Sequence, residues 1–216
     1  MEIIDKSFSE ELANALLDIN AVVLRPSEPF VWSSGWNSPI YCDNRLTLRH
    51  PELRAKITQH FADHIRRTNP DVNVITGTAT AGIPHAAWVA DRLEKPMAYV
   101  RSKAKSYGMG NQIEGGVKKG ESTLIIEDLI STAGSILSVV DVLKFVGAEV
   151  KQLMTIFTYG FDIAEKRIGE YKIPAYCLTD YHTLINIAQE KGIIDDEELE
   201  LLTQWRSTPD IWPNYA

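Results

Sequence analysis

The sequence predicts an α/β protein with a mostly parallel central sheet that is flanked by helices. Two observations favour this class. Short apolar runs of strand length alternate with segments of helical periodicity over about residues 51–180. Loops of small and hydroxyl residues follow several of the apolar runs. In open parallel sheets, ligands bind beyond the carboxyl ends of the strands, so these loops are the first place to look for a site.

The first fifty residues predict one helix and then an extended segment. Ser7 and Glu10 have the spacing of a capping box, and leucines follow at helical spacing, which indicates a helix over 7–20. Residues 22–45 hold short apolar pieces that prolines and a glycine interrupt. This pattern favours short strands or extended loops. We expect residues 30–50 to form part of a small hood over the ligand site.

The alternation begins at Pro51, which starts a second helix with apolar residues on one face. The predicted strands are 72–76, 97–101, 123–126, 150–159 and 173–178. The predicted helices are 84–93, 135–146, 161–170 and about 195–205, followed by an irregular tail. We expect one domain over 1–216: a helix and hood segment over about 1–50, a core over about 51–180, and a C-terminal helix and tail over about 181–216.

The composition is that of a soluble globular protein. The chain has 216 residues, of which 44% are hydrophobic and 24% charged, and its net charge is −7. The negative charge argues against non-specific nucleic-acid binding. No apolar run reaches the roughly 20 residues of a membrane span, and the N-terminus lacks the pattern of a secretory signal. With only two distant cysteines, the sequence predicts a cytoplasmic protein without a membrane or nucleic-acid partner.

One stretch carries the strongest chemical signal. LIIEDLISTAGS, residues 124–135, reads as a buried strand, then two acids, then a loop of small and hydroxyl residues that enters a helix. Such a loop offers N–H and O–H groups to a phosphate, whereas Glu127 and Asp128 would repel it and need sugar hydroxyls or a cation. A ribose 5-phosphate satisfies both halves. The alternative is that Ser131 or Ser135 merely caps the next helix and the acids are solvated.

Two further loops lie after predicted strands at the same sheet edge. The segment 101–116 holds Arg101, Lys103 and Lys105 among several glycines, as expected of a hinged basic flap that closes over a negatively charged ligand. The alternative is a solvated loop with incidental lysines. The compact loop 77–82 offers backbone N–H groups, or is a tight turn capped by threonine. Lys118 and Lys119 are further basic candidates.

These motifs resemble a known family. LIIEDLISTAGS is similar to the phosphoribosyl pyrophosphate (PRPP) signature of type I phosphoribosyltransferases. Residues 101–115 look like the mobile loop of the orotate phosphoribosyltransferases, 31–46 (VWSSGWNSPIYCDNRL) like their N-terminal substrate segment, and 77–84 (GTATAGIP) like their pyrophosphate loop. The four matches keep the family order. The resemblance implies a type I phosphoribosyltransferase fold, orotate and PRPP as substrates, Mg²⁺ bound mainly through PRPP without direct protein ligands, and a homodimer whose mobile loop completes the partner's site.

The resemblance also implies residue roles. Lys105, Arg101 and Asp128 would be catalytic. The PRPP-binding residues would be Arg101, Lys105, Tyr107, Glu127, Asp128, Leu129, Ile130, Ser131, Thr132, Ala133, Gly134 and Ser135. The pyrophosphate loop would be Thr78, Ala79, Thr80 and Ala81, and orotate would contact Ser131, Tyr41 and Cys42.

The sequence departs from the family pattern at several positions. Tyr107 stands where a histidine is common, Ser33 and Ser102 stand where some members have lysine, and residues 157–161 lack the arginine that some members use for orotate. Ala133 occupies a position that is often glycine. Two alternatives stay open: a phosphoribosyltransferase for another nucleobase, and a non-catalytic PRPP-sensing regulator of the same fold. His60 and His64 have a spacing that suits a metal site or, more simply, one helix face.

Overall fold

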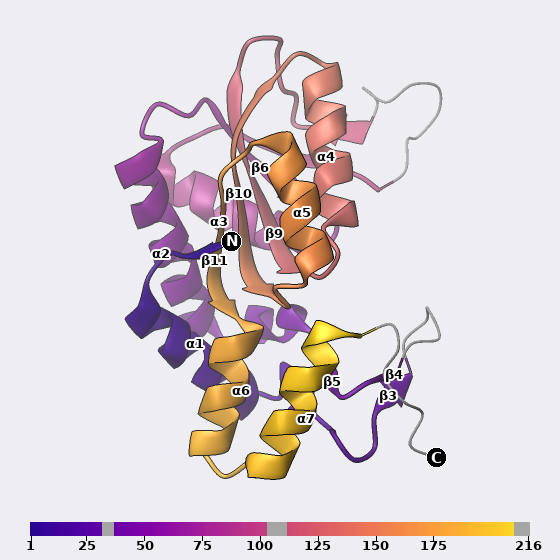
Figure 1. Cartoon of the computed structure of the whole chain (residues 1–216). Helices are drawn as coiled ribbons and strands as arrows, with labels where there is room; N and C mark the ends of the chain where they lie inside the picture. The colour runs from indigo at the N-terminus through magenta and orange to yellow at the C-terminus, as the bar shows by residue number, and fades with distance from the viewer. Residues whose placement is uncertain (32–36, 103–111, 210–216) are drawn as a thin grey trace.

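A mostly parallel sheet forms the centre of the molecule. The computed structural model describes residues 1–31, 37–102 and 112–209, and within them the sheet has the strand order β1-β11-β10-β9-β6-β7-β8 (Figure 1). Its strands are β1 (Glu2–Ile3), β6 (Val74–Thr78), β7 (Met97–Val100), β8 (Ile113–Glu114), β9 (Ser122–Ile130), β10 (Glu149–Thr158) and β11 (Ala175–Asp180). Each pairing is parallel except that of β8 with β7, which confirms the predicted α/β class.

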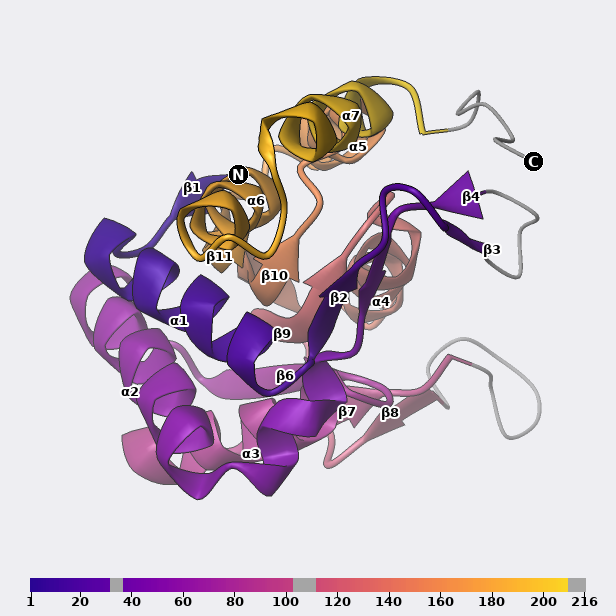
Figure 2. The same ribbon diagram turned by 90° about the horizontal axis from the view of Figure 1, so that it is seen from below.

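Helices cover both faces of this sheet. On one side lie α1 (Lys6–Asp18), α2 (Pro51–Thr68) and α3 (Gly82–Leu93), and on the other lie α4 (Gly134–Phe145) and α5 (Asp162–Tyr171), as Figure 2 shows. Side chains alternate between the faces along each strand. In β9, Leu124 and Ile126 therefore enter the core beneath α1–α3, while Ile125 enters the core beneath α4 and α5.

A smaller region lies beyond the carboxyl ends of the strands (Figure 1). It contains the antiparallel pairs β2 (Val22–Leu24) with β5 (Ile40–Cys42) and β3 (Phe30–Val31) with β4 (Asn37–Ser38), the 3₁₀ helix η1 (Asn44–Arg49), and helices α6 (Tyr181–Glu190) and α7 (Asp196–Ser207). Trp205 of α7 is fully buried, contacts Tyr159 and Tyr181, and donates from its indole N–H to the Asn37 carbonyl at 3.2 Å. The C-terminal helices thus share a region that the sequence assigned mainly to the N-terminal segment.

Three local predictions need correction. The first helix begins one residue early, because Asp5 and not Ser7 is its N-cap and accepts from the Phe8 N–H at 3.1 Å. The strand predicted to end at residue 126 continues to Ile130, so both acids lie within the strand. Helix α6 and strands β1 and β8 were not predicted. The other boundaries agree or differ by one or two residues: β6 and β11 each start and end two residues late, and α3 starts two residues early.

The connections place a topological switch point between β6 and β9. The chain leaves β6 through α3 toward β7, whereas it leaves β9 through α4 toward β10, on the other side. The two loops therefore diverge and leave a crevice between the neighbouring strands, which is where open α/β sheets bind ligands. Among the helices of the described residues, none is long and apolar enough to cross a membrane.

Candidate active site

A cleft of about 580 Å³ lies at this switch point. Three segments line it: residues 79–81 after β6, residues of 127–135 at the end of β9 and the start of α4, and the segment where β5 passes into η1, with Cys42, Asp43 and Arg45. The loops that the sequence singled out after two separate strands thus meet at one edge of the sheet. The hood segment reaches the same place, because the Asn44 side-chain amide donates to the Asp128 carbonyl at 2.7 Å.

The two acids are held in an unfavourable environment for charge. Glu127 is only 5% exposed, and Asp128 is half-buried beside it. Burial, and then the Asp128 charge, raise the pKa of Glu127 well above its ordinary value, and burial also raises the pKa of Asp128. The Glu127 carboxylate accepts from the Asp128 N–H at 3.1 Å. Two adjacent carboxylates with raised pKa values favour a partner that donates hydrogen bonds or carries positive charge.

The loop after β9 ends in an open helix N-terminus. The N-cap of α4 is Ala133, whose side chain has no hydrogen-bonding atom, so the first-turn N–H groups receive no cap from it. This rules out the alternative that Ser131 or Ser135 is the cap. Ser131 and Ser135 instead line the cleft. Ala133 has φ 64°, a left-handed conformation that glycine adopts without cost, which gives a physical reason for glycine at this position in other chains.

The loop after β6 lies beside the acid pair, on the other wall of the cleft. Its Ala79–Thr80 peptide bond is cis, and the Ala79 N–H donates to the Val100 carbonyl at 3.0 Å. Gly82, the first residue of α3, approaches β9 so closely that a Cβ there would lie 2.4 Å from the Ile126 carbonyl oxygen. The sequence had placed Gly82 in a compact loop that offers backbone N–H groups, without a packing role of its own. The structure shows that it permits the contact between the 79–81 loop and the strand of the acids.

An ion pair forms the outer wall of the cleft. The Arg45 guanidinium donates to both carboxylate oxygens of Asp43, at 2.6 and 2.8 Å, and its side chain is 62% exposed. These hydrogen bonds lower the pKa of Asp43. Cys42 faces the cleft, and burial, followed by the charges of Asp128 and Asp43, raises the pKa of its thiol. Tyr41 does not line the cleft: it is 45% exposed and its ring lies against Phe30.

The basic residues divide into three groups. Arg101 follows β7, and its guanidinium lies 3.7 Å from Glu114. Lys103, Lys105 and Tyr107 lie outside the described residues, as does Ser33. Lys118 and Lys119 precede β9 and so lie at the amino ends of the parallel strands, opposite the cleft at their carboxyl ends. The Lys119 side chain packs against Gly147. The expectation that these two lysines add charge at the site is therefore wrong.

Of the remaining predicted positions, Thr78, Ile130 and Thr132 do not line the cleft, whereas Leu129, between the acids and Ser131, does. Thr78 is buried at the end of β6, and Ile130 is buried at the end of β9. Thr132 accepts at its carbonyl from Arg167 at 3.0 Å, which anchors the loop to α5.

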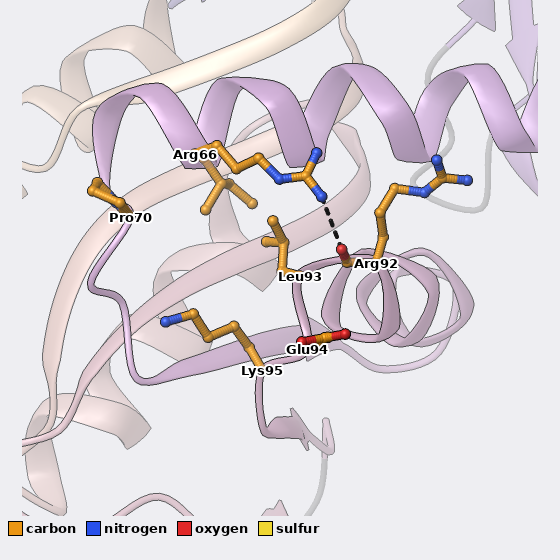
Figure 3. A pocket seen from close by; sticks show the side chains of 7 residues that line it. Arg66, Pro70, Arg92, Leu93, Glu94 and Lys95 are labelled. Atoms are coloured by element: carbon orange, nitrogen blue, oxygen red, sulfur yellow. Dashed lines mark hydrogen bonds between the residues drawn. The ribbon is translucent and has the colours of Figure 1, made fainter.

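A second, basic cavity lies near the amino ends of β6 and β7, away from the cleft (Figure 3). It has about 310 Å³ and lies between the C-terminal ends of α2 and α3, near Arg66, Arg92 and Lys95. The Arg66 guanidinium donates to the Arg92 carbonyl at 2.9 Å, as the dashed line in Figure 3 shows. Helix C-termini attract cations, so these side chains are explained as partners of helix ends, and the same ends disfavour an anionic ligand.

The two histidines of α2 are packing residues. The His60 ring stacks on Phe8 at 3.6 Å, whereas His64 is buried against Tyr176 at 4.4 Å. Burial, and then the Arg67 charge, lower the pKa of His64 to about 4. The described part of the chain contains no group of three or more His, Cys, Asp or Glu that could hold a metal ion.

Known proteins of one family are similar to this chain. The phosphoribosyl transferase domain matches residues 47–187. The orotate phosphoribosyltransferase of Halalkalibacterium halodurans is 52% identical over 207 residues, which cover 95% of this chain and 99% of the relative. That of Listeria innocua is 50% identical over 206 residues, with the same coverage.

Solved structures agree with these sequence matches. Leishmania donovani UMP synthase has a TM-score of 0.77 at 26% identity, covering 92% of this chain and 42% of that one. The orotate phosphoribosyltransferase of Aeropyrum pernix has a TM-score of 0.72 at 27% identity, covering 85% of this chain and 99% of that one. The relatives, the fold and the cleft at the switch point agree, and the chain belongs to the orotate phosphoribosyltransferase family.

Proposed function

We propose that this chain transfers the 5-phosphoribosyl group of PRPP to N1 of orotate, giving orotidine 5′-phosphate and pyrophosphate in pyrimidine nucleotide synthesis. One observation carries the proposal. A buried acid pair and an open helix N-terminus face a single cleft, so one molecule with ribose hydroxyls and a 5′-phosphate fits both. Membership of the orotate phosphoribosyltransferase family supports orotate as the acceptor.

The cleft suggests how PRPP lies in it. Glu127 and Asp128 accept hydrogen bonds from the ribose hydroxyls, which offsets the cost of burying two neighbouring carboxylates. The 5′-phosphate lies at the N-terminus of α4, on the N–H groups of residues 132–135. The pyrophosphate lies toward residues 79–81, on the other wall of the same cleft.

The chemistry is a displacement at the anomeric carbon. Orotate N1 forms the new C–N bond while the C–O bond to pyrophosphate breaks, and the transition state resembles an oxocarbenium ion. Positive charge grows on the ribose near the acid pair, and negative charge grows on the leaving group. The protein acts by holding the reactants in line and by supplying fixed charges, with Arg101, Lys105 and, in support, Lys103 directed at pyrophosphate.

The hood side of the cleft offers the contacts for orotate. Ser131 and Cys42 line the cleft on the side of the hood segment, whereas the Tyr41 ring is turned toward Phe30. Arg45 stands at the rim with an exposed guanidinium and suits the orotate carboxylate. The hydrogen bonds to Asp43 fix the direction of the Arg45 guanidinium.

Mg²⁺ fits the site only together with substrate. The described residues contain no group of three or more His, Cys, Asp or Glu that could hold a metal ion, so Mg²⁺, which prefers oxygen ligands, would be bound mainly through PRPP oxygens and water, without direct protein ligands. When bound, Mg²⁺ neutralises part of the pyrophosphate charge. The proposal includes a homodimer in which segment 101–115 completes the partner's site, and a cytoplasmic location, with which the two free cysteines agree.

The proposal is tested by following orotate absorbance in the presence of PRPP, with and without Mg²⁺, and by repeating the assay with adenine, guanine and uracil. We expect orotate consumption that needs both PRPP and Mg²⁺. Turnover of another base in place of orotate would identify a different phosphoribosyltransferase. PRPP binding without turnover of any base would favour the non-catalytic regulator.

A further inference from the structure

Asn44 is a fully buried polar residue between the hood segment and the acid pair. It is 0% exposed, and its side-chain amide donates to the Asp128 main-chain carbonyl at 2.7 Å across 84 positions of sequence. A buried amide needs its hydrogen bonds satisfied, so this contact fixes Asn44 and Asp128 relative to each other. Asn44 does not line the cleft itself.

The Asp128 carbonyl lies where the regular sheet has ended on one side. The pairing of β6 with β9 runs from Val74–Thr123 to Gly77–Ile126 and stops two residues before Asp128. Beyond that point β6 turns into the 79–81 loop. The amide of Asn44 therefore supplies a donor at a part of β9 that has no β6 residue opposite it, and the hydrogen bond extends the fixed backbone to the residue that carries the second acid.

The other contacts of Asn44 reach the outer wall. Its amide oxygen accepts from the Cys42 thiol at 3.5 Å, and its carbonyl accepts from the Thr47 hydroxyl at 2.6 Å. Its neighbours in sequence, Asp43 and Arg45, form the ion pair at the rim. One side chain thus connects the wall that holds Cys42 and Arg45 to the strand that holds the acids.

We propose that Asn44 is a positioning residue for PRPP: it fixes the Asp128 carboxylate for the ribose hydroxyls and sets the hood wall at the correct distance from it. The inference rests on the proposed function, because it assigns Asn44 a role in binding the same substrate. Asn44 touches no reacting atom. Its effect passes through the backbone of Asp128.

The test compares Asn44→Ala with a matched control, Thr47→Val. Thr47 is also fully buried in η1, and the variant loses one hydrogen bond, from the Thr47 hydroxyl to the Asn44 carbonyl, which does not involve Asp128. PRPP affinity is measured by calorimetry with Mg²⁺ and without orotate, and the melting temperature of each variant is recorded. We expect Asn44→Ala to weaken PRPP binding at least about tenfold, and Thr47→Val to change it less than about twofold at a comparable loss of melting temperature.

A double-mutant cycle with Asp128→Asn tests whether Asn44 acts through Asp128. Asp128→Asn keeps the main-chain carbonyl but removes the charge that is being positioned. If Asn44 acts through that charge, Asn44→Ala costs little further PRPP affinity in the Asp128→Asn background. Equal losses in both backgrounds would overturn the inference, and so would equal losses in Asn44→Ala and Thr47→Val.

Two controls keep the outcomes separate. Wild-type turnover of orotate with PRPP is measured in the same preparation, so that its absence refutes the proposed function, whereas wild-type turnover with an unaffected Asn44→Ala refutes only the inference. If Asn44→Ala yields no folded protein, Asn44→Leu, which keeps nearly the same volume and has no donor, takes its place in both comparisons.

Discussion

Gly82 gives the most direct link between packing and the proposed chemistry. It begins α3, follows the 79–81 loop, and lies against the strand that carries the acids. A Cβ at this position would be 2.4 Å from the Ile126 carbonyl oxygen and 3.3 Å from the Glu127 Cα. Both obstacles are backbone atoms that no rotamer change can move. A methyl group therefore requires the start of α3 and β9 to separate by about 1 Å before the contact is normal.

The size of the effect follows from this displacement. Overpacking of a tight site costs about 1–3 kcal/mol of unfolding free energy. For a chain of this length, a loss of about 2 kcal/mol corresponds to a melting temperature lower by roughly 4–8 °C. The separation also moves residues 79–81 away from Glu127, and a misplacement of about 1 Å can cost on the order of 10²-fold in rate.

Gly82→Ala is therefore compared with Gly169→Ala by thermal unfolding and by orotate turnover. Gly169 lies in α5, where an added Cβ meets no atom within 4 Å, and alanine is the better helix former by about 1 kcal/mol. We expect Gly82→Ala to lose both melting temperature and kcat/KM for PRPP, and Gly169→Ala to keep its rate with equal or higher melting temperature. A Gly82→Ala enzyme with wild-type stability and rate would refute the reasoning.

Three further predictions concern the same cleft. Ala133→Gly removes the cost of a left-handed alanine, about 1 kcal/mol, so chemical denaturation should show no loss of unfolding free energy; a loss above about 1 kcal/mol would contradict the assigned backbone. Glu127→Gln removes a carboxylate whose pKa is raised by burial, so the wild-type protein should lose stability relative to this variant as pH rises above the ordinary carboxyl range. The variant should also bind PRPP more weakly. If the melting temperatures of the two proteins change equally from pH 5 to about 8, the raised pKa of Glu127 is excluded. Lys105→Ala should lower kcat on the order of 10²-fold with an unchanged melting temperature, and near-wild-type turnover would remove Lys105 from the mechanism.

The alternation of strands and helices was readable because its signals are local. The apolar runs of β9 and β10 and the amphipathic pattern of α2 are each contained in one segment of sequence, and their loops carry the small residues of a binding site. Helix α6 was missed although Asp180 caps it and accepts from the Thr183 N–H at 2.8 Å. That cap, followed by apolar Leu184, Ile185 and Ala188, was a signal in the sequence.

Other features depend on contacts that sequence spacing does not reveal. The acids lie within β9 because the strand continues beside β10, which pairs with it as far as Ile130. Two adjacent charged residues, Glu127 and Asp128, do not indicate in the sequence that a strand continues through them. Asn44 reaches Asp128, and Trp205 reaches Asn37, only because distant segments fold over the same sheet edge. In the sequence, Lys118 and Lys119 looked equivalent to the basic residues of 101–105. They precede a strand and do not follow one, so they lie at the amino ends of the strands, away from the cleft.

The position of PRPP tests the central claim most directly. A crystal structure of the protein with PRPP and Mg²⁺ should show the 5′-phosphate within hydrogen-bond distance of the N–H groups at the start of α4, and the ribose hydroxyls at Glu127 and Asp128. Binding of PRPP at the cavity between Arg66 and Lys95, or in the cleft with its phosphate turned away from α4, would contradict the account.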